Sequence, residues 1–194
     1  MSKSLFLETI KIEEGKVFNL SYHQARFSKT QKAFFGMKHS LPLSDMIDAP
    51  PTGLYRCRIL YDETIQKIEY IPYTFKKIQT LKIVSSDIDY AYKYADRKIF
   101  STLLEMHSKA DEIIIEKDGY LTDTTIANIA FYDGTKWLTP LNPLLKGTTM
   151  TRLLDEGLLH PKKIKKEELA NYPYVALMNA MIGFKIIKNV NIFL

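Results

Sequence analysis

Short strand-like segments bounded by turn residues run along almost the whole chain, and they constrain the possible folds more than any other feature. In such segments apolar or β-branched residues fill runs of four to eight positions, with Gly, Asp or Asn between the runs. Many short strands with few helices predict an α+β fold whose second half is barrel-like. The segments are residues 5–12, 17–20, 54–61, 65–73, 81–85, 112–116, 120–123, 128–132, 137–139, 175–178 and 184–190.

Helical patterns are few. The first is predicted from residue 22 to residue 35, preceded by a capping box between Ser21 and Gln24 and ended by Gly36. Two more are predicted over residues 97–108 and 150–156. Because the pattern restarts near residues 73–77, we predict a small α+β domain over residues 1–74 and a larger barrel-like domain over residues 75–194.

Cysteine usage and hydropathy indicate the compartment. The sequence has a single cysteine, Cys57, so no disulfide can form within the chain, as is typical of a reducing compartment. No apolar run approaches the roughly 20 residues of a membrane-spanning helix, and the first residues lack the pattern of a signal peptide. We therefore expect a cytoplasmic protein without a membrane partner.

The basic balance of the chain, with a formal charge of +5 and a pI of about 9.1, has two interpretations. A basic face could bind nucleic acid or a phosphorylated ligand. Alternatively, the lysines lie in solvated loops, and their mixing with acidic residues, as over residues 162–168, favours this second interpretation.

Several kinds of functional site are not indicated. The sequence has no glycine-rich phosphate loop, no serine in a nucleophile elbow, and no metal-ligand spacing among its four histidines. From the residues alone, the chain is an α+β protein whose function is not indicated, and we expect no metal.

Five segments in series resemble the class IV aminotransferases and, most closely, the aminodeoxychorismate lyases. In order along the chain they are residues 15–26 (GKVFNLSYHQAR), 92–97 (YKYADR), 121–131 (LTDTTIANIAF), 138–152 (LTP followed by GTTMTR) and 178–181 (MNAM). Their order and spacing match the family over nearly the whole chain. The resemblance implies a two-domain fold like that of D-amino acid aminotransferase, with pyridoxal 5′-phosphate (PLP) as cofactor.

The resemblance assigns the centre of the PLP site to Lys93 and Asp123. Lys93 matches the lysine that holds PLP as a Schiff base and then shuttles protons. Asp123 stands where the family usually has Glu, as the carboxylate opposite the pyridine nitrogen, and its side chain is one methylene shorter. Without the resemblance, Lys93 is one surface lysine among many and Asp123 is a turn residue.

The resemblance also assigns residues to the cofactor phosphate. Arg26 matches the phosphate arginine, whose fork suits two oxygens. Met150 and Thr151 match backbone donors at the start of a helix, and Asn179 with Ala180 matches a second contact. A solvated position on the first helix is the alternative for Arg26.

Substrate recognition is assigned to Arg58 and Thr125. Arg58 lies on one strand face with Arg56 and is a candidate for holding a substrate carboxylate, whereas an arginine pair on an exposed strand is the alternative. Thr125 either lines the cofactor pocket or is only a strand residue. The segment that matches the family's F-E-T strand begins at Phe6, so we expect a first domain shortened at its front.

Four functions follow from these observations. The first is a lyase that converts 4-amino-4-deoxychorismate to 4-aminobenzoate and pyruvate in folate biosynthesis. The second is a transaminase for D- or branched-chain amino acids, which needs a keto-acid acceptor. The third is a basic binding module, whose affinity for nucleic acid would fall steeply with salt. The fourth is a family member that binds PLP without turnover. The resemblance also implies a homodimer.

Overall fold

The computed structural model describes residues 4–193, which form two compact units, each with its own sheet and core. The first unit extends to Phe75 and also contains Tyr92–Asp96. The second unit comprises Lys76–Ala91 and the chain from Arg97 onward. Residues 92–96, which the predicted boundaries leave with the second domain, are grouped with the first unit by their contacts.

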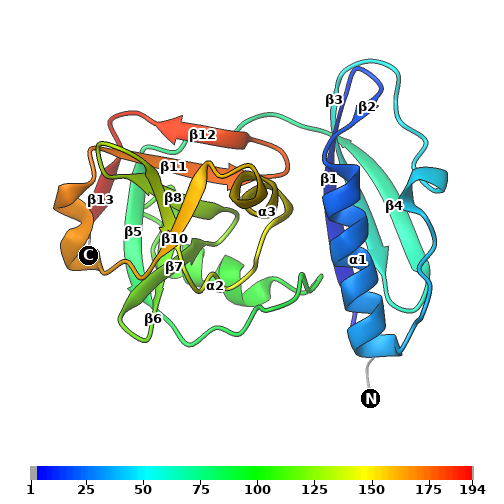
Figure 1. Cartoon of the computed structure of the whole chain (residues 1–194), viewed down its shortest axis with the longest axis horizontal. Coiled ribbons are helices and arrows are strands. Elements are labelled where there is room, and N and C mark those ends of the chain that lie inside the picture. The colour runs from blue at the N-terminus through cyan, green and yellow to red at the C-terminus, as the bar shows by residue number, and fades with distance from the viewer. Residues whose placement is uncertain (1–3, 194) are drawn as a thin grey trace. The chain divides into compact units, whose positions relative to one another are not determined.

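The first unit is an antiparallel sheet with one helix along it (Figure 1). The strands are β1 (Phe6–Glu13), β2 (Lys16–Val17), β3 (Leu54–Tyr61) and β4 (Ile65–Pro72), in the order β2-β1-β3-β4. The helix is α1 (Leu20–Phe35), and a short 3₁₀ turn, η1 (Leu43–Asp45), follows it. The core between helix and sheet consists of Phe6, Ile10, Ile12, Phe27, Leu43, Cys57, Ile59 and Tyr61.

Strand β3 has the two faces that its sequence predicts. Cys57, Ile59 and Tyr61 are fully buried, whereas Arg56 and Arg58 are only partly buried. Because successive side chains of a strand point to opposite faces, the two arginines lie on the face away from this core.

The predicted start of the first helix is wrong in two respects. The strand expected over residues 17–20 ends at Val17, and α1 begins at Leu20 after Asn19, whose left-handed backbone (φ 52°) turns the chain into the helix. Asparagine tolerates this conformation better than most residues. The expected capping box does not form, because Gln24 instead accepts a hydrogen bond from the backbone N–H of Leu43 (2.7 Å).

The second unit is a nine-stranded mixed sheet that wraps around its own core, with two helices and one 3₁₀ turn (Figure 1). The strand order is β10-β9-β8-β7-β6-β5-β13, and β11 pairs with both β8 and β12. The strands are β5 (Thr80–Ser85), β6 (Glu112–Lys117), β7 (Tyr120–Thr124), β8 (Asn128–Tyr132), β9 (Trp137–Pro140), β10 (Leu159–Lys162), β11 (Tyr174–Asn179), β12 (Gly183–Ile187) and β13 (Asn191–Phe193). The helices are α2 (Lys98–Met106), α3 (Thr148–Asp155) and the 3₁₀ turn η2 (Lys166–Asn171).

Two strands of the second unit were not predicted as such. The edge strand β10 contains Pro161 and has three exposed residues, so neither alternation nor composition identifies it. The segment expected as one strand over residues 184–190 ends at Ile187, and β13 then pairs in parallel with β5. The α+β class with few helices is confirmed. None of the helices in residues 4–193 has the length and apolar character needed to cross a membrane.

Candidate active site

Lys93 lies at the middle of a three-residue turn in the first unit. The backbone N–H of Tyr94 donates to the carbonyl of Tyr92 (2.9 Å), which closes the turn around Lys93. The Lys93 carbonyl accepts a hydrogen bond from the N–H of Leu7 in β1 (2.9 Å). The lysine is half-buried. One hydrogen bond within the turn and one from β1 therefore fix its backbone.

A buried charge cluster in the same unit contains the predicted Arg26. Arg26 donates from Nε and Nη2 to the two carboxylate oxygens of Glu8, at 2.8 and 2.6 Å. His23 Nδ1 lies 2.6 Å from Glu8 Oε2, and both side chains are fully buried. The two-pronged pair with Glu8 fixes the plane of the Arg26 guanidinium. The role of Arg26 toward a phosphate stays a prediction.

Burial and neighbouring charges set the protonation of this cluster. Burial would raise the pKa of Glu8, but the charge and hydrogen bonds of Arg26, with help from His23, outweigh it and hold the pKa at about 2. Burial lowers the pKa of His23, and the positive charges of Arg26 and Lys93 lower it further against the opposing effect of Glu8. His23 is therefore neutral near pH 7 and donates its Nδ1 proton to the Glu8 carboxylate.

Sequence reasoning did not select Glu8 or His23. His23 and Arg26 are three residues apart on α1 and therefore share one helix face. Glu8 shares one face of its strand with the apolar residues Phe6, Ile10 and Ile12, and this was the available signal, because buried carboxylates need a partner.

The predicted Asp123 is a buried carboxylate in the second unit. Its oxygens accept hydrogen bonds from Asn128 Nδ2 (2.7 Å) and from the backbone N–H of Leu145 (2.9 Å). Burial raises the pKa of Asp123 to about 7, although these hydrogen bonds oppose the shift. Within residues 4–193 no ion pair reaches it. Asp123 is thus a carboxyl group that a positively charged ligand atom would help to ionise.

Asn128 joins Asp123 to the start of α3. Besides its bond to Asp123, its Nδ2 donates to the carbonyl of Leu145 (2.8 Å), and its Oδ1 accepts from the N–H of Gly147 (3.2 Å). A Cβ added at Gly147 would lie 2.3 Å from Asn128 Oδ1, so only glycine fits this approach. Both residues lie in segments that resemble the family, but no role was predicted for either of them.

We expect Gly147→Ala to destabilise the protein by about 1–3 kcal/mol, because the new methyl group overlaps the Asn128 amide. Urea unfolding measures this loss. In an Asn128→Ala background the overlapping atom is gone, so the same substitution should cost much less. Equal costs in both backgrounds would contradict this account of Gly147.

The N-terminus of α3 lies two residues earlier than predicted. The helix begins at Thr148, and the N–H of Thr151 already donates to the carbonyl of Gly147 (2.9 Å). The N–H groups that precede this bond belong to Thr148, Thr149 and Met150. Thr149 is buried, and its hydroxyl has no hydrogen-bond partner in the described part of the chain. The predicted Met150 is therefore at the helix start, whereas the Thr151 N–H is not available to a ligand.

Thr125 is held by a buried acid instead of facing an open surface. Its N–H and hydroxyl both donate to Glu112 Oε1, at 3.1 and 2.6 Å. Arg97 donates to the Thr125 carbonyl and lies over the Phe100 ring, 5.0 Å from its centre. These contacts fix the segment between Asp123 and Asn128, so the geometry gives Thr125 a structural role and leaves its substrate role without support.

The remaining predicted residues also have protein partners. Arg58 pairs with Glu69 across β3 and β4 (3.1 Å), and both are partly exposed. The Asn179 side chain donates to the Ile126 carbonyl (3.1 Å) and accepts from the N–H of Met181 (2.9 Å), which shapes the turn that contains Ala180. Their roles toward substrate and phosphate stay predictions.

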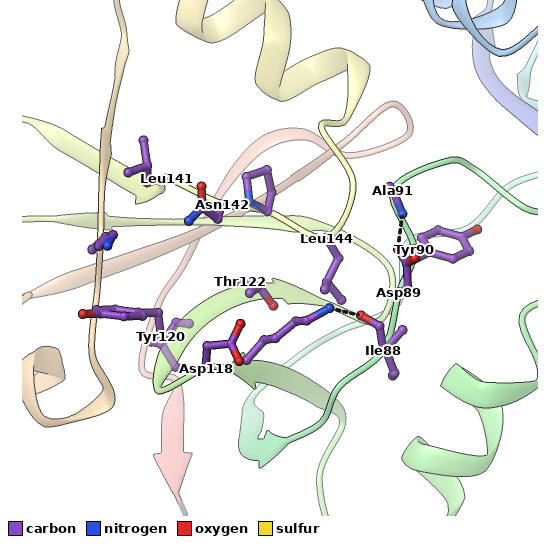
Figure 2. Close-up of a pocket in the computed structure, with 14 residues that line it drawn as sticks. Ile88, Asp89, Tyr90, Ala91, Asp118, Tyr120, Thr122, Leu141, Asn142 and Leu144 are labelled. Atoms are coloured by element: carbon purple, nitrogen blue, oxygen red, sulfur yellow. Dashed lines mark hydrogen bonds between the residues drawn. The ribbon is translucent and has the colours of Figure 1, made fainter. Parts of the chain in front are cut away.

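A cavity of about 270 Å³ lies elsewhere in the second unit (Figure 2). Thr122 and Leu144 line it, and Lys117, which also lines it, donates to the Ile88 carbonyl (3.0 Å). Thr122 precedes Asp123 on β7, and because alternate side chains of a strand point to opposite faces, Asp123 points away from this cavity. None of the predicted site residues lines it. No three His, Cys, Asp or Glu side chains in residues 4–193 are grouped as metal ligands.

The fold and these residues define an enzyme of the class IV aminotransferase type, and comparison with known proteins agrees. The family model for amino-transferase class IV matches residues 91–190. The chain belongs to this family, and the predictions of family, fold class and enzyme are confirmed.

Three relatives illustrate the similarity. An uncharacterised protein of Haemophilus influenzae is 36% identical over 91% of this chain and 97% of its own length. A solved structure of a candidate 4-amino-4-deoxychorismate lyase from Haemophilus somnus is 37% identical, with a TM-score of 0.86, over 94% of this chain and 99% of the other. A candidate aminodeoxychorismate lyase of Schizosaccharomyces pombe is 29% identical over 93% of this chain and 87% of its own.

Proposed function

We propose that the protein is a PLP-dependent lyase that converts 4-amino-4-deoxychorismate to 4-aminobenzoate and pyruvate. The observation that carries this choice is the similarity, at 37% identity over nearly the full length of both chains, to a candidate lyase of that name. The five sequence segments that resemble aminodeoxychorismate lyases support it. A class IV transaminase for D- or branched-chain amino acids is the alternative.

The described residues fit PLP. Asp123 is a buried carboxyl group with a pKa of about 7 and no cationic partner among residues 4–193, which suits a protonated pyridine nitrogen. The start of α3 has backbone donors and the buried, unpartnered hydroxyl of Thr149, which suits a phosphate. Lys93 would supply the amine that bonds to the cofactor, and Arg26 a further cation for the phosphate.

When bound, PLP supplies an electron sink for the carbon that bears the substrate's amino group. The Nζ atom of Lys93 then removes the proton from that carbon. The bond between the neighbouring ring carbon and the ether oxygen of the enolpyruvyl group breaks, its electron pair leaves with the oxygen, and the six-membered ring becomes aromatic. Lys93 returns the proton to the departing group, which leaves as pyruvate. Asp123, which Asn128 holds in place, would supply the carboxylate for the pyridine nitrogen of the bound cofactor.

The defining experiment measures the two products without any keto-acid acceptor. Purified protein with PLP and 4-amino-4-deoxychorismate should release pyruvate and 4-aminobenzoate in equal amounts. A transaminase would instead release no pyruvate from this substrate and would transfer amino groups from D-alanine or a branched-chain amino acid to 2-oxoglutarate. If PLP binds but neither activity is found, the protein is a family member that binds PLP without turnover. If PLP does not bind and the protein binds nucleic acid with an affinity that falls with salt, it is a basic binding module.

Two threonines of α3 provide a matched test of the phosphate site. We expect Thr149→Val to weaken PLP binding about tenfold, because it removes a hydroxyl that has no other partner. Thr151→Val should leave PLP binding near the wild-type value, since its hydroxyl and N–H both donate to the Gly147 carbonyl. Titration of PLP followed by absorbance measures both. A larger loss in Thr151→Val than in Thr149→Val would contradict this choice and would favour Thr151 as the phosphate ligand, as the resemblance implies.

We infer further that the protein acts in folate biosynthesis and as a homodimer, as the family resemblance implies, and in the cytoplasm, as its cysteine usage and hydropathy indicate. Light scattering coupled to size-exclusion chromatography tests the homodimer, for which the 22.5 kDa chain should give twice its mass.

A further inference from the structure

A cluster of aromatic rings surrounds the turn that contains Lys93. Tyr92 and Tyr94, on either side of the lysine, both take part in it. Their partners are Phe6 of β1 and Phe34 near the end of α1. The ring centres are 4.6 Å apart for Phe6 and Phe34, 4.7 Å for Phe34 and Tyr92, and 5.2 Å for Phe6 and Tyr94. We name these four residues the ring cluster.

Backbone hydrogen bonds tie the same segment to the start of β1. The Leu7 N–H donates to the Lys93 carbonyl (2.9 Å), and the Ala95 N–H donates to the Leu5 carbonyl (2.8 Å). Phe6 and Tyr94 form an antiparallel bridge between these two bonds. The segment is therefore a short added strand on β1, and two hydrogen bonds alone hold such a strand weakly.

The ring contacts compensate for the small number of hydrogen bonds. Phe6 is fully buried and touches both Phe34 and Tyr94, so it connects the helix, the strand and the lysine turn. Aromatic pairs at these separations add stability beyond the area that they bury. Because Tyr94 belongs to the turn and Phe6 to β1, movement of the turn away from β1 would separate this ring pair.

We propose that Phe6, Phe34, Tyr92 and Tyr94 are positioning residues for Lys93: by holding its turn closed, the ring cluster keeps the lysine amine in one place for reaction with an aldehyde. The inference rests on the proposed function only for the identity of that aldehyde. The hold on the turn is a property of the cofactor-free chain and can be measured without PLP.

Phe34 is the residue to change, because its ring is 40% exposed and its removal spares the buried core. In cofactor-free Phe34→Ala, the amides of Leu7 and Ala95 should exchange hydrogen about tenfold faster than in the wild type. The visible absorbance band that appears when PLP bonds to Lys93 should also form about tenfold more slowly. Phe34→Tyr, which keeps the ring, should restore both values.

Phe18→Ala is the matched control. Phe18 is 36% exposed and lies in the same unit, but its ring lies against Lys11, outside the ring cluster. It should leave the exchange of Leu7 and Ala95 and the rate of band formation unchanged. Wild-type exchange at both amides in Phe34→Ala, or an equal acceleration in Phe18→Ala, would overturn the proposal.

The two measurements test different claims: amide exchange tests whether the ring cluster holds the turn, and the PLP band tests the proposed function. Faster exchange in Phe34→Ala with no band in the wild type would contradict PLP binding and still support the hold on the turn. Faster exchange with an unchanged rate of band formation would overturn the positioning role.

Discussion

Lys93→Ala is expected to abolish the visible band of bound PLP and to reduce the turnover of 4-amino-4-deoxychorismate by about 10³-fold or more. The substitution removes both the amine that bonds to the cofactor and the group that moves the proton, and such groups contribute factors of this size. Absorbance before and after borohydride treatment, together with the intact mass of the protein, measures the covalent bond. Wild-type protein should retain the cofactor mass after treatment, and the variant should not.

Lys98→Ala is the control for this prediction. Lys98 is an exposed lysine five residues on, at the start of α2. Its replacement should leave the band, the borohydride-fixed mass and the turnover near the wild-type values. A band that persists in Lys93→Ala and disappears in Lys98→Ala would show that the resemblance had been aligned to the wrong lysine.

Glu8→Gln is expected to destabilise the protein by about 3–5 kcal/mol, since it leaves the Arg26 guanidinium without its buried counter-charge and the His23 Nδ1–H without its carboxylate acceptor. Urea unfolding at pH 7 measures this loss. Glu69→Gln is the control, because Glu69 pairs with Arg58 and Lys67 at a partly exposed surface, where water screens such pairs and they contribute little. Similar losses in the two variants would contradict the importance of the buried cluster.

The same carboxylate predicts acid sensitivity. The pKa of Glu8 falls from 4.5 to about 2 on folding, so the unfolded chain binds its proton first as the pH falls. The stabilisation is therefore complete above about pH 5 and is lost progressively toward pH 2, by about 3 kcal/mol in all. His23, whose pKa is also lowered, adds a loss in the same direction that begins near its ordinary value of 6.5. The unfolding free energy of Glu8→Gln should fall less over pH 5 to 2 than that of the wild type.

The sequence predicts the existence of helix α3 but not the residue at which it begins. The glycine and threonine run predicts a helix near Met150, and the structure has one, but it begins at Thr148. The sequence could not set this boundary, because Gly147 is placed by its hydrogen bond to Asn128, nineteen residues earlier in the chain. The choice between Thr149 and Thr151 as a ligand of the phosphate therefore depends on a tertiary contact.

Among the charged side chains of the first unit, the sequence predicts which strand face they occupy but not which partners they have. The sequence separates Arg56 and Arg58 from Cys57, Ile59 and Tyr61, because strand alternation is a local property. It does not place Glu8 against Arg26, since that pairing depends on how α1 packs across β1. The cost of burying an unpaired carboxylate then makes the pairing obligatory.

By itself, the sequence determined the α+β class and the family, and it selected Lys93 and Asp123 as candidate site residues, because order and spacing along the chain are sufficient for a resemblance. The tertiary structure alone decided which groups surround them: the ring cluster at Lys93, the Glu8 cluster at Arg26, and Asn128 between Asp123 and Gly147. The physical reason is that hydrogen bonds, ring contacts and burial depend on distances in space, and these join residues far apart in the sequence.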